Sequence, residues 1–211
     1  MWALTPGVDD TWLPRASFPG RGSAVTGVVD GRIYVAGGWG EGAAVDDLAV
    51  YDPATDAWAD LAPMPAPRDH ACGAAIDGVL VVVGGRMIDI ASHTDTVFRY
   101  DPASDAWTQG APMPTGRGGA ACGVVGGELV VVGGEGNPND PSGVFSVAEA
   151  YDAAADTWRV LPAMITPRHG MAAGAWGEQL FVPGGATIQA FGASEVHEIL
   201  TIPSATVQSS E

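Results

Sequence analysis

The stretch RDHACGAAIDGVLVVVGG, residues 68–85, decides the fold because its pattern occurs four times in the chain. An arginine begins the pattern and a glycine pair follows sixteen residues later. The other three steps run from Arg21 to Gly37, from Arg117 to Gly133 and from Arg168 to Gly184. Arginine-to-arginine distances of 47, 49 and 51 residues indicate a repeat architecture with about 50 residues per unit.

Each unit predicts four strands, which we call a, b, c and d in chain order. In residues 68–85, strand a covers 71–76, Asp77-Gly78 forms a hairpin turn, and strand b covers 80–83. Asp-Gly between apolar runs is a strong hairpin signal, since both turn positions need positive φ. In three units strand c ends at a Tyr and strand d begins at a Trp seven residues later, as in Tyr100 and Trp107.

These motifs resemble the kelch family over nearly the whole chain, from Trp12 to about Leu200. The resemblance implies four-stranded antiparallel blades set radially around a channel. We therefore predict an all-β kelch-type β-propeller in residues 1–200. Its repeats span about 21–67, 68–116, 117–167 and 168–200, residues 9–15 serve as a closing strand, and residues 201–211 form a C-terminal tail.

Closure of the ring is the open structural question, because the fourth unit lacks its Tyr and Trp. At the other end of the chain, Asp10-Thr11-Trp12 matches the start of strand d. We expect this N-terminal segment to complete the fourth blade, which would bury Trp12 and cover two sheet edges. The alternatives are a partial propeller that associates with a second copy, or a fragment of a longer chain.

Composition limits the partners. The net charge is −16, all nine basic residues are arginine, and this balance argues against nucleic acid and anionic membranes as partners. The first residues show neither a charged start nor a long apolar core, so we expect no secretory signal and a soluble, cytoplasmic protein.

The two cysteines lie on strand a of adjacent units. Cys72 and Cys122 stand twelve and eleven residues before their glycine pairs. Because successive strand residues point to opposite faces, we expect no disulfide and two reduced thiols in the core, which suits a cytoplasmic setting.

Topology predicts the functional face. Because the strands alternate in direction, the b–c and d–a loops share one end of the blades, and only the b–c loops vary in length. Variable loops on a rigid frame are where recognition is usually built. The candidate ligand-binding residues in these loops are Trp39, Glu41, Arg86, His93, Glu135 and Asn139. The repeated arginines Arg21, Arg68, Arg117 and Arg168 belong to the same end, where we expect mainly a structural duty in every blade. Arg86 breaks the repeat pattern and is the best single candidate for contacting an acidic partner.

The resemblance implies a non-catalytic kelch-repeat module that binds a protein or peptide through the b–c and d–a loop face. A homodimer is expected if the ring stays open. The alternative is a kelch-type enzyme acting on a sugar or small polar ligand, similar to the mutarotases of this fold, with Arg86, His93 and Glu135 as acid–base candidates. We predict no cofactor and no metal site.

Overall fold

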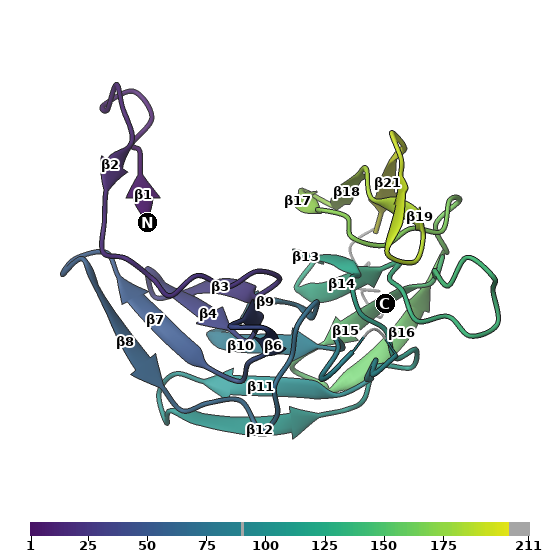
Figure 1. Ribbon diagram of the computed structural model, residues 1–211, viewed down its shortest axis with the longest axis horizontal. Coiled ribbons are helices and arrows are strands. Elements are labelled where there is room, and N and C mark those ends of the chain that lie inside the picture. Colours follow the sequence, from purple (N-terminus) through teal and green to yellow (C-terminus); the bar gives the residue numbers. More distant parts are fainter. Residues whose placement is uncertain (90, 203–211) are drawn as a thin grey trace, which may run out of the picture.

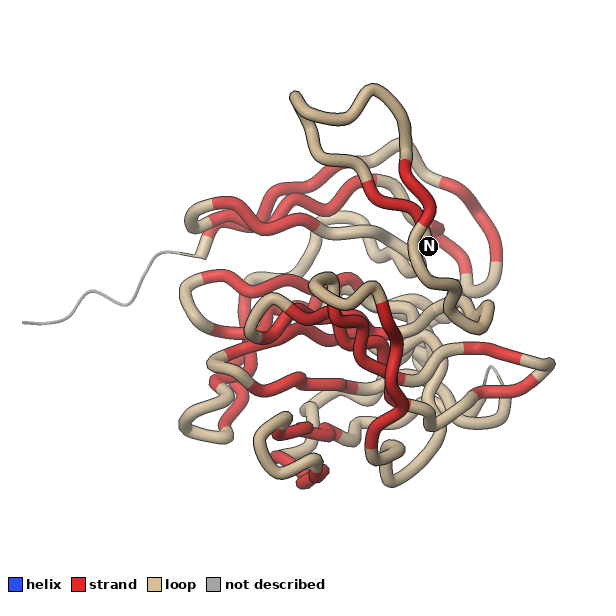
Figure 2. The backbone as a smooth tube through the Cα atoms, turned by 90° about the vertical axis from the view of Figure 1, so that its left-hand side faces the viewer, coloured by secondary structure: helices blue, strands red, loops and turns tan. Residues whose placement is uncertain are grey.

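The computed structural model describes residues 1–89 and 91–202. Figure 2 shows that the described backbone consists of strands and loops, without a helical segment. The predicted all-β fold is confirmed. In this part of the chain, no helix has the length and hydropathy needed to cross a bilayer.

The strands form four blades arranged as a β-propeller (Figure 1). Blade 1 contains β3 (Val25–Val29), β4 (Arg32–Ala36), β7 (Leu48–Asp52) and β8 (Ala57–Leu61). Blade 2 contains β9 (Cys72–Ile76), β10 (Val79–Val83), β11 (Val97–Asp101) and β12 (Ala106–Gly110). Blade 3 contains β13 (Ala121–Val125), β14 (Glu128–Val132), β15 (Ala148–Asp152) and β16 (Thr157–Leu161). Blade 4 contains β17 (Gly174–Trp176), β18 (Gln179–Pro183) and β21 (His197–Thr201).

Three small hairpins lie outside the blades. They are β1 (Trp2–Ala3) with β2 (Leu13–Pro14), β5 (Trp39–Gly40) with β6 (Ala43–Ala44), and β19 (Ala186–Ile188) with β20 (Phe191–Ala193). The last two belong to the b–c loops of blades 1 and 4.

The repeated sequence step forms the two innermost strands of each blade. In blade 2, Asp77 and Gly78 turn the chain with φ values of 49° and 81°, and β9 pairs with β10 from Val79↔Ile76 to Val83↔Cys72. The glycine pair then ends β10 at φ values of 63° and 91°. A Cβ atom on Gly84 would collide with the carbonyl oxygen of Arg117, so the pair lets adjacent blades approach closely.

The core lies between the blades, where neighbouring sheets pack against each other. Tyr34 of blade 1 packs with Leu80 and Val82 of blade 2, and Leu80 is fully buried. Gly27 provides room for the Leu80 side chain, since a Cβ at this glycine would lie 2.7 Å from Leu80 Cδ1. Unbroken apolar runs such as residues 79–83 suit strands buried on both faces.

The c–d turns connect each blade to the segment before it. The Tyr100 hydroxyl donates to Asp105 at 2.7 Å, and Asp105 also accepts the backbone N–H of Ala62 at 2.9 Å. The Trp107 indole N–H donates to the Ala62 carbonyl at 2.8 Å. Corresponding contacts occur at Asp56 and Trp58 in blade 1 and at Asp156 and Trp158 in blade 3. The turn aspartates Asp56, Asp105 and Asp156 therefore bind each blade to the segment that precedes it.

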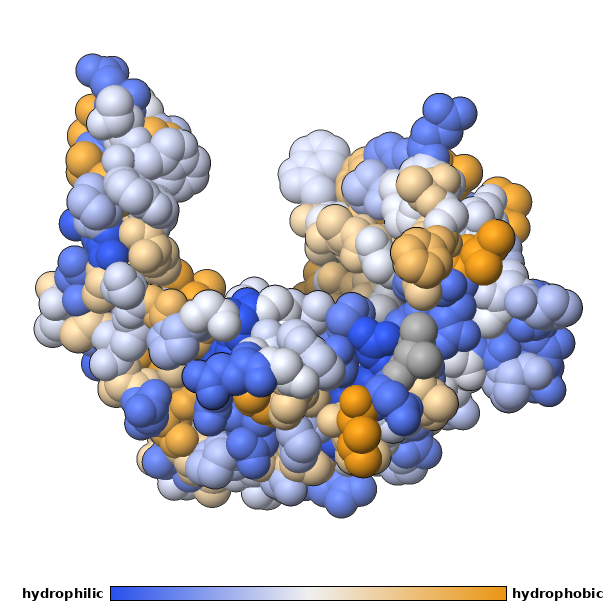
Figure 3. Space-filling view, in the orientation of Figure 1, coloured by the Kyte–Doolittle hydropathy of each residue, from blue (hydrophilic) through white to orange (hydrophobic). Residues whose placement is uncertain are grey.

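The predicted closure by the N-terminal strand is wrong. β2 pairs with β1, and the described sheet of blade 4 has the order β17-β18-β21. Trp12 is 63% exposed. The hairpin and blade 4 lie at opposite ends of an open arc (Figure 1), and Figure 3 shows the molecule hollowed between these two arms. The alternative of a partial propeller therefore describes the observed arrangement.

The prediction of two reduced cysteines is also wrong. Cys72 and Cys122 form a disulfide with a Cα–Cα distance of 6.1 Å. Each cysteine lies on the innermost strand of its blade. The two side chains do lie on opposite faces of their sheets. Neighbouring blades, however, stack so that one face of blade 2 packs against the opposite face of blade 3, and this brings the two sulfur atoms together. The cysteines therefore give no support to a cytoplasmic setting. Of the predicted tail 201–211, residues 203–211 lie outside the described residues.

Candidate functional site

One end of the blades is built by a recurring backbone bridge. The residue after each repeated arginine pairs with the residue after the glycine pair of the same unit. These pairs are Gly22↔Trp39, Asp69↔Arg86, Gly118↔Glu135 and His169↔Ala186. We call the polar residues gathered here, Asp69, His70, Arg86, Glu135 and His169, the mouth cluster.

Arg86 holds the mouth cluster together across two blades. Its Nη1 donates to Glu135 Oε1 at 3.0 Å, and its Nη2 donates to Asp69 Oδ2 at 3.2 Å. The Arg86 side chain is 14% exposed, whereas those of Asp69 and Glu135 are 5% and 2% exposed. Both buried carboxylates therefore share one guanidinium group, which already has two acidic partners within the chain.

His70 occupies a backbone conformation that suits glycine. Its φ is 51°, and the corresponding positions of blades 3 and 4 are Gly119 and Gly170, with φ values of 60° and 61°. The His70 Nδ1 lies 2.6 Å from Asp69 Oδ2, and Nε2 lies 3.5 Å from the hydroxyl of Ser23 in blade 1. Local backbone strain of this kind concentrates at functional sites.

Glu135 continues the cluster to blade 4. Its Oε2 lies 3.4 Å from His169 Nδ1, and His169 Nε2 lies 3.0 Å from the Ile188 carbonyl oxygen. Because a carbonyl oxygen only accepts hydrogen bonds, Nε2 carries a proton in this arrangement. The other ring nitrogen, Nδ1, faces the Glu135 carboxylate.

His93 lies beside the mouth cluster and is half-buried. It forms a backbone bridge with Arg86, and its Nε2 is a buried atom without a hydrogen-bond partner. Burial lowers the pKa of the His93 imidazole. The ring is therefore best suited to packing as a neutral group.

A pocket of about 320 Å³ opens beside the cluster. It is lined by Trp39, Asp69, His70, Arg86, Ile88 and Asp89. Trp39 is 42% exposed and Ile88 is 78% exposed, so an aromatic and an aliphatic side chain border a charged floor. Glu135 and His93 do not belong to the lining.

The four repeated arginines are held within the frame. Arg68, Arg117 and Arg168 are at most 3% exposed, and the side chain of Arg21 is 5% exposed. Arg21, Arg117 and Arg168 each donate to the carbonyl oxygen fourteen residues later, at 3.2, 3.1 and 3.3 Å. Arg68 instead donates to the Pro67 carbonyl and lies 5.0 Å from the ring of Phe98. Burial lowers the pKa of all four guanidinium groups.

The remaining predicted residues lie apart from the pocket. Glu41 is exposed in the turn between β5 and β6, with a φ of 53°. Asn139 is exposed in the blade 3 loop, where its backbone N–H donates to the Asn137 side chain at 3.1 Å. The structure thus brings Trp39 and Arg86 together at the pocket, with Glu135 and His93 behind it.

Sequence reasoning missed Asp69, His70 and His169 as site residues. Each stands one or two places after a repeated arginine, where other units have glycine or serine. That departure from the repeat was a usable signal, because it parallels the departure that singled out Arg86. Among the described residues, no group of three or more His, Cys, Asp or Glu side chains is arranged to hold a metal ion.

Comparisons with known proteins agree with this architecture. The model of the KLHDC2/KLHL20/DRC7 Kelch-repeats domain matches residues 13–134, and the Kelch motif matches residues 116–165. The Kelch-like protein terF of Aspergillus terreus is 36% identical over 190 residues, which cover 85% of this chain and 41% of that protein. The chain therefore spans about two fifths of this relative.

Two shorter matches and one solved structure add to the comparison. An F-box/kelch-repeat protein of Arabidopsis thaliana is 35% identical over 86 residues, covering 37% of this chain and 20% of that protein. The influenza virus NS1A-binding protein homolog of Mus musculus is 38% identical over 65 residues, covering 31% and 10%. The structure of YjhT aligns with a TM-score of 0.76 at 23% identity, covering 87% of this chain and 65% of that one.

Proposed function

The chain belongs to the kelch-repeat family, and from this premise we propose that it is a non-catalytic binding module whose partner is a protein or peptide. The contact surface in this proposal is the end of the blades formed by the b–c and d–a loops. The observation that carries it is the pocket in which exposed Trp39 and Ile88 stand beside a charged floor. Family relationship alone does not define a partner, so the argument rests on this site.

The pocket combines the features of a peptide-binding anchor. Exposed aromatic side chains are enriched at interface hot spots, because they bury a large area and lose little conformational freedom. Trp39 comes from blade 1, whereas Asp69, Arg86 and Ile88 come from blade 2, so a bound side chain would touch two blades. The mouse relative is named as the homolog of an NS1A-binding protein, which agrees with an interaction role.

The structure changes the expected part of Arg86. Its two acidic partners, Asp69 and Glu135, are supplied by the chain itself, so we assign Arg86 to holding the floor of the pocket. In this proposal Trp39 and Ile88 make the main contacts with the partner.

The enzyme alternative has less support. Acid–base work on a sugar needs titratable groups within hydrogen-bond reach of the ligand. Glu135 is 2% exposed, and neither it nor His93 lines the pocket. We also propose self-association for the open arc, because blade 4 has three described strands and β21 pairs on one side only among the described residues.

The loop-face proposal can be tested with a random peptide library displayed on phage. Selected peptides would be synthesised with a fluorophore, and their Kd for the full chain measured by anisotropy. We expect Trp39→Ala and Ile88→Ala to weaken binding at least tenfold. The matched control is Ala103→Arg in the c–d turn of blade 2, which should leave Kd unchanged. Peptides that bind W39A as tightly as the wild type, or failure to select any peptide, would contradict the proposal.

A further inference from the structure

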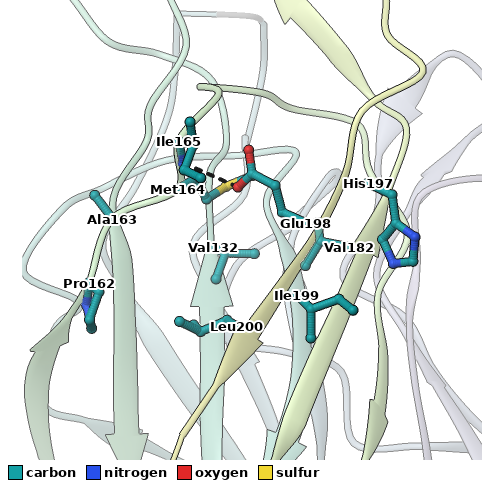
Figure 4. Close-up of a pocket in the computed structure, with 10 residues that line it drawn as sticks. All are labelled: Val132, Pro162, Ala163, Met164, Ile165, Val182, His197, Glu198, Ile199 and Leu200. Carbon is teal, nitrogen blue, oxygen red and sulfur yellow. Dashed lines mark hydrogen bonds between the residues drawn. The ribbon is translucent and has the colours of Figure 1, made fainter.

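An apolar pocket lies in blade 4, away from the mouth cluster. It has a volume of about 450 Å³ and lies between strand β21, the core of blade 3 and the segment that leaves blade 3 (Figure 4). Val132, Pro162, Met164, Val182 and Leu200 form its apolar lining, with Ile165 at its rim. We call this pocket the Trp socket, because a tryptophan fills the corresponding place in blades 2 and 3.

In blades 2 and 3 the corresponding place is filled by the tryptophan that begins strand d. The Trp107 indole donates to the Ala62 carbonyl at 2.8 Å, and the Trp158 indole donates to the Ala111 carbonyl at 2.9 Å. Ala62 and Ala111 each stand four residues after the tryptophan of the preceding blade. In blade 3 the residue four places after Trp158 is Pro162, which lines the pocket.

Methionine burial gives independent evidence that none of the described residues fills the socket. Met64 and Met113 stand six residues after Trp58 and Trp107, and both are 2% exposed. Met164 stands six residues after Trp158 but is only half-buried and lines the pocket. Blade 4 has Leu200 where the other blades have their Tyr, and no Trp follows Leu200 among the described residues.

The chain carries a matching element at its other end. Trp12 is followed four residues later by Ala16, in the same spacing as Trp58 and Ala62. Ala16 also makes the contacts of the repeat, because its N–H donates to Asp56 at 2.9 Å and its carbonyl accepts the Trp58 indole N–H at 3.3 Å. The segment therefore keeps the register of a strand d, while Trp12 itself is 63% exposed.

We propose that the Trp socket of blade 4 receives Trp12 from a second copy of this chain. The two elements belong to one repeat pattern but lie at opposite ends of the open arc (Figure 1), so a second copy can bring them together without closing the ring. Exchange of equivalent elements between copies is a low-cost route to a dimer. The inference deepens the self-association proposed above and does not depend on the loop-face pocket.

Solution mass of the full chain tests the proposal. Size-exclusion chromatography with light scattering over a concentration series should show a species of twice the 21.5 kDa chain mass. Trp12→Ala should raise the dimer dissociation constant at least tenfold and leave the circular dichroism spectrum unchanged, since the side chain is exposed. Ile165→Arg, at a position 92% exposed on the socket rim, should have the same effect. Trp39→Ala is the matched control, because it removes an exposed tryptophan at the mouth and should leave the mass unchanged.

Mixing the two variants gives a second, independent readout. W12A keeps an intact socket and I165R keeps an intact Trp12, so an equimolar mixture should form a heterodimer that neither variant forms alone. A monomeric wild type at all concentrations would overturn the proposal, as would a dimer that survives both substitutions. Dimerisation that appears only after deletion of residues 203–211 would overturn the proposal too. That result would mean that the end of the same chain, and not Trp12 of a second copy, occupies the socket. Loss of the dimer with retained peptide binding separates this surface from the loop face.

Discussion

The disulfide between blades 2 and 3 gives the sharpest test of the fold. Cys72 and Cys122 are separated by 50 residues in the sequence. In the chain-entropy model, a cross-link closing a loop of about 50 residues lowers the entropy of the unfolded chain by an amount equivalent to about 4 kcal/mol at 25 °C. Replacing both cysteines by alanine should therefore lower the free energy of unfolding by about 4 kcal/mol.

The expected change in melting temperature follows from the chain length. With an unfolding entropy of about 2.1 cal/mol/K per residue over the 211 residues, a loss of about 4 kcal/mol lowers Tm by about 9 °C. Differential scanning calorimetry of the wild type with and without reductant measures the same quantity without a mutation. A thiol titration after unfolding confirms that the bond has been reduced.

The control is Cys122→Ala, in which reductant should not change Tm. The wild type should lose about 9 °C on reduction, and the double variant should melt near the reduced wild type. Equal melting temperatures of the oxidised and reduced wild type would refute the reasoning, because they would mean that the cross-link does not constrain the unfolded chain. A free-thiol count of two in the untreated folded protein would refute the disulfide itself.

The remaining predictions concern buried charge and titration. Arg86→Ala leaves the carboxylates of Asp69 and Glu135 without their shared cation. Urea unfolding should therefore show a free energy of unfolding that is lower by about 3–5 kcal/mol. A decrease of less than about 1 kcal/mol would contradict the buried network. Burial and the hydrogen bond to Asp156 raise the pKa of Tyr151 to about 12. The contribution of this group to stability is therefore full below about pH 10 and is lost as pH rises through the folded pKa. Absorbance at 295 nm should show a late-titrating component that is smaller by one tyrosine in Tyr151→Phe than in the wild type. Hydrogen bonds from Tyr151 and a backbone N–H lower the pKa of Asp156. The contribution of this carboxylate to folding stability is therefore present above about pH 4 and is lost as pH falls further. A Tm that stays constant from pH 5 to pH 2 would contradict this prediction.

The repeat made most of the strands predictable from the sequence. Strand a was expected at residues 71–76 and strand b at 80–83, and the structure has β9 at Cys72–Ile76 and β10 at Val79–Val83. The agreement is close because local signals all act in the same direction here. Asp77-Gly78 specifies the turn, the apolar run specifies a buried strand, and Gly84-Gly85 ends it.

Contacts between blades were less predictable, because strand periodicity describes one sheet at a time. Cys72 and Cys122 do lie on opposite strand faces, as the periodicity predicts, but the disulfide depends on how neighbouring sheets stack. The closure argument correctly matched Trp12 to the pattern of strand d. It could not foresee that residues 2–3 would pair with residues 13–14, because Trp2–Ala3 has no repeat signature.

The mouth cluster was partly predictable for a similar reason. Arg86 and Glu135 were found because they follow a glycine pair, whereas Asp69 and His169 were missed because they follow an arginine. The backbone bridges show that these two kinds of position are partners. A search of both positions together would have found the cluster.

The contacts of the mouth cluster link neighbouring blades, and stability alone does not explain them. The arginine and the glycine pair carry the frame of each blade, so the positions beside them can differ from blade to blade. The differences are nevertheless linked, since Arg86 reaches Glu135 at 3.0 Å and Glu135 reaches His169 at 3.4 Å. Buried ion pairs are weak stabilisers compared with apolar packing of the same volume, and the equivalent bridge position of blade 4, Ala186, shows that the frame does not need a charge there. A charged network spread over three blades is therefore better explained by the surface that it shapes, beginning with the pocket floor beside Trp39.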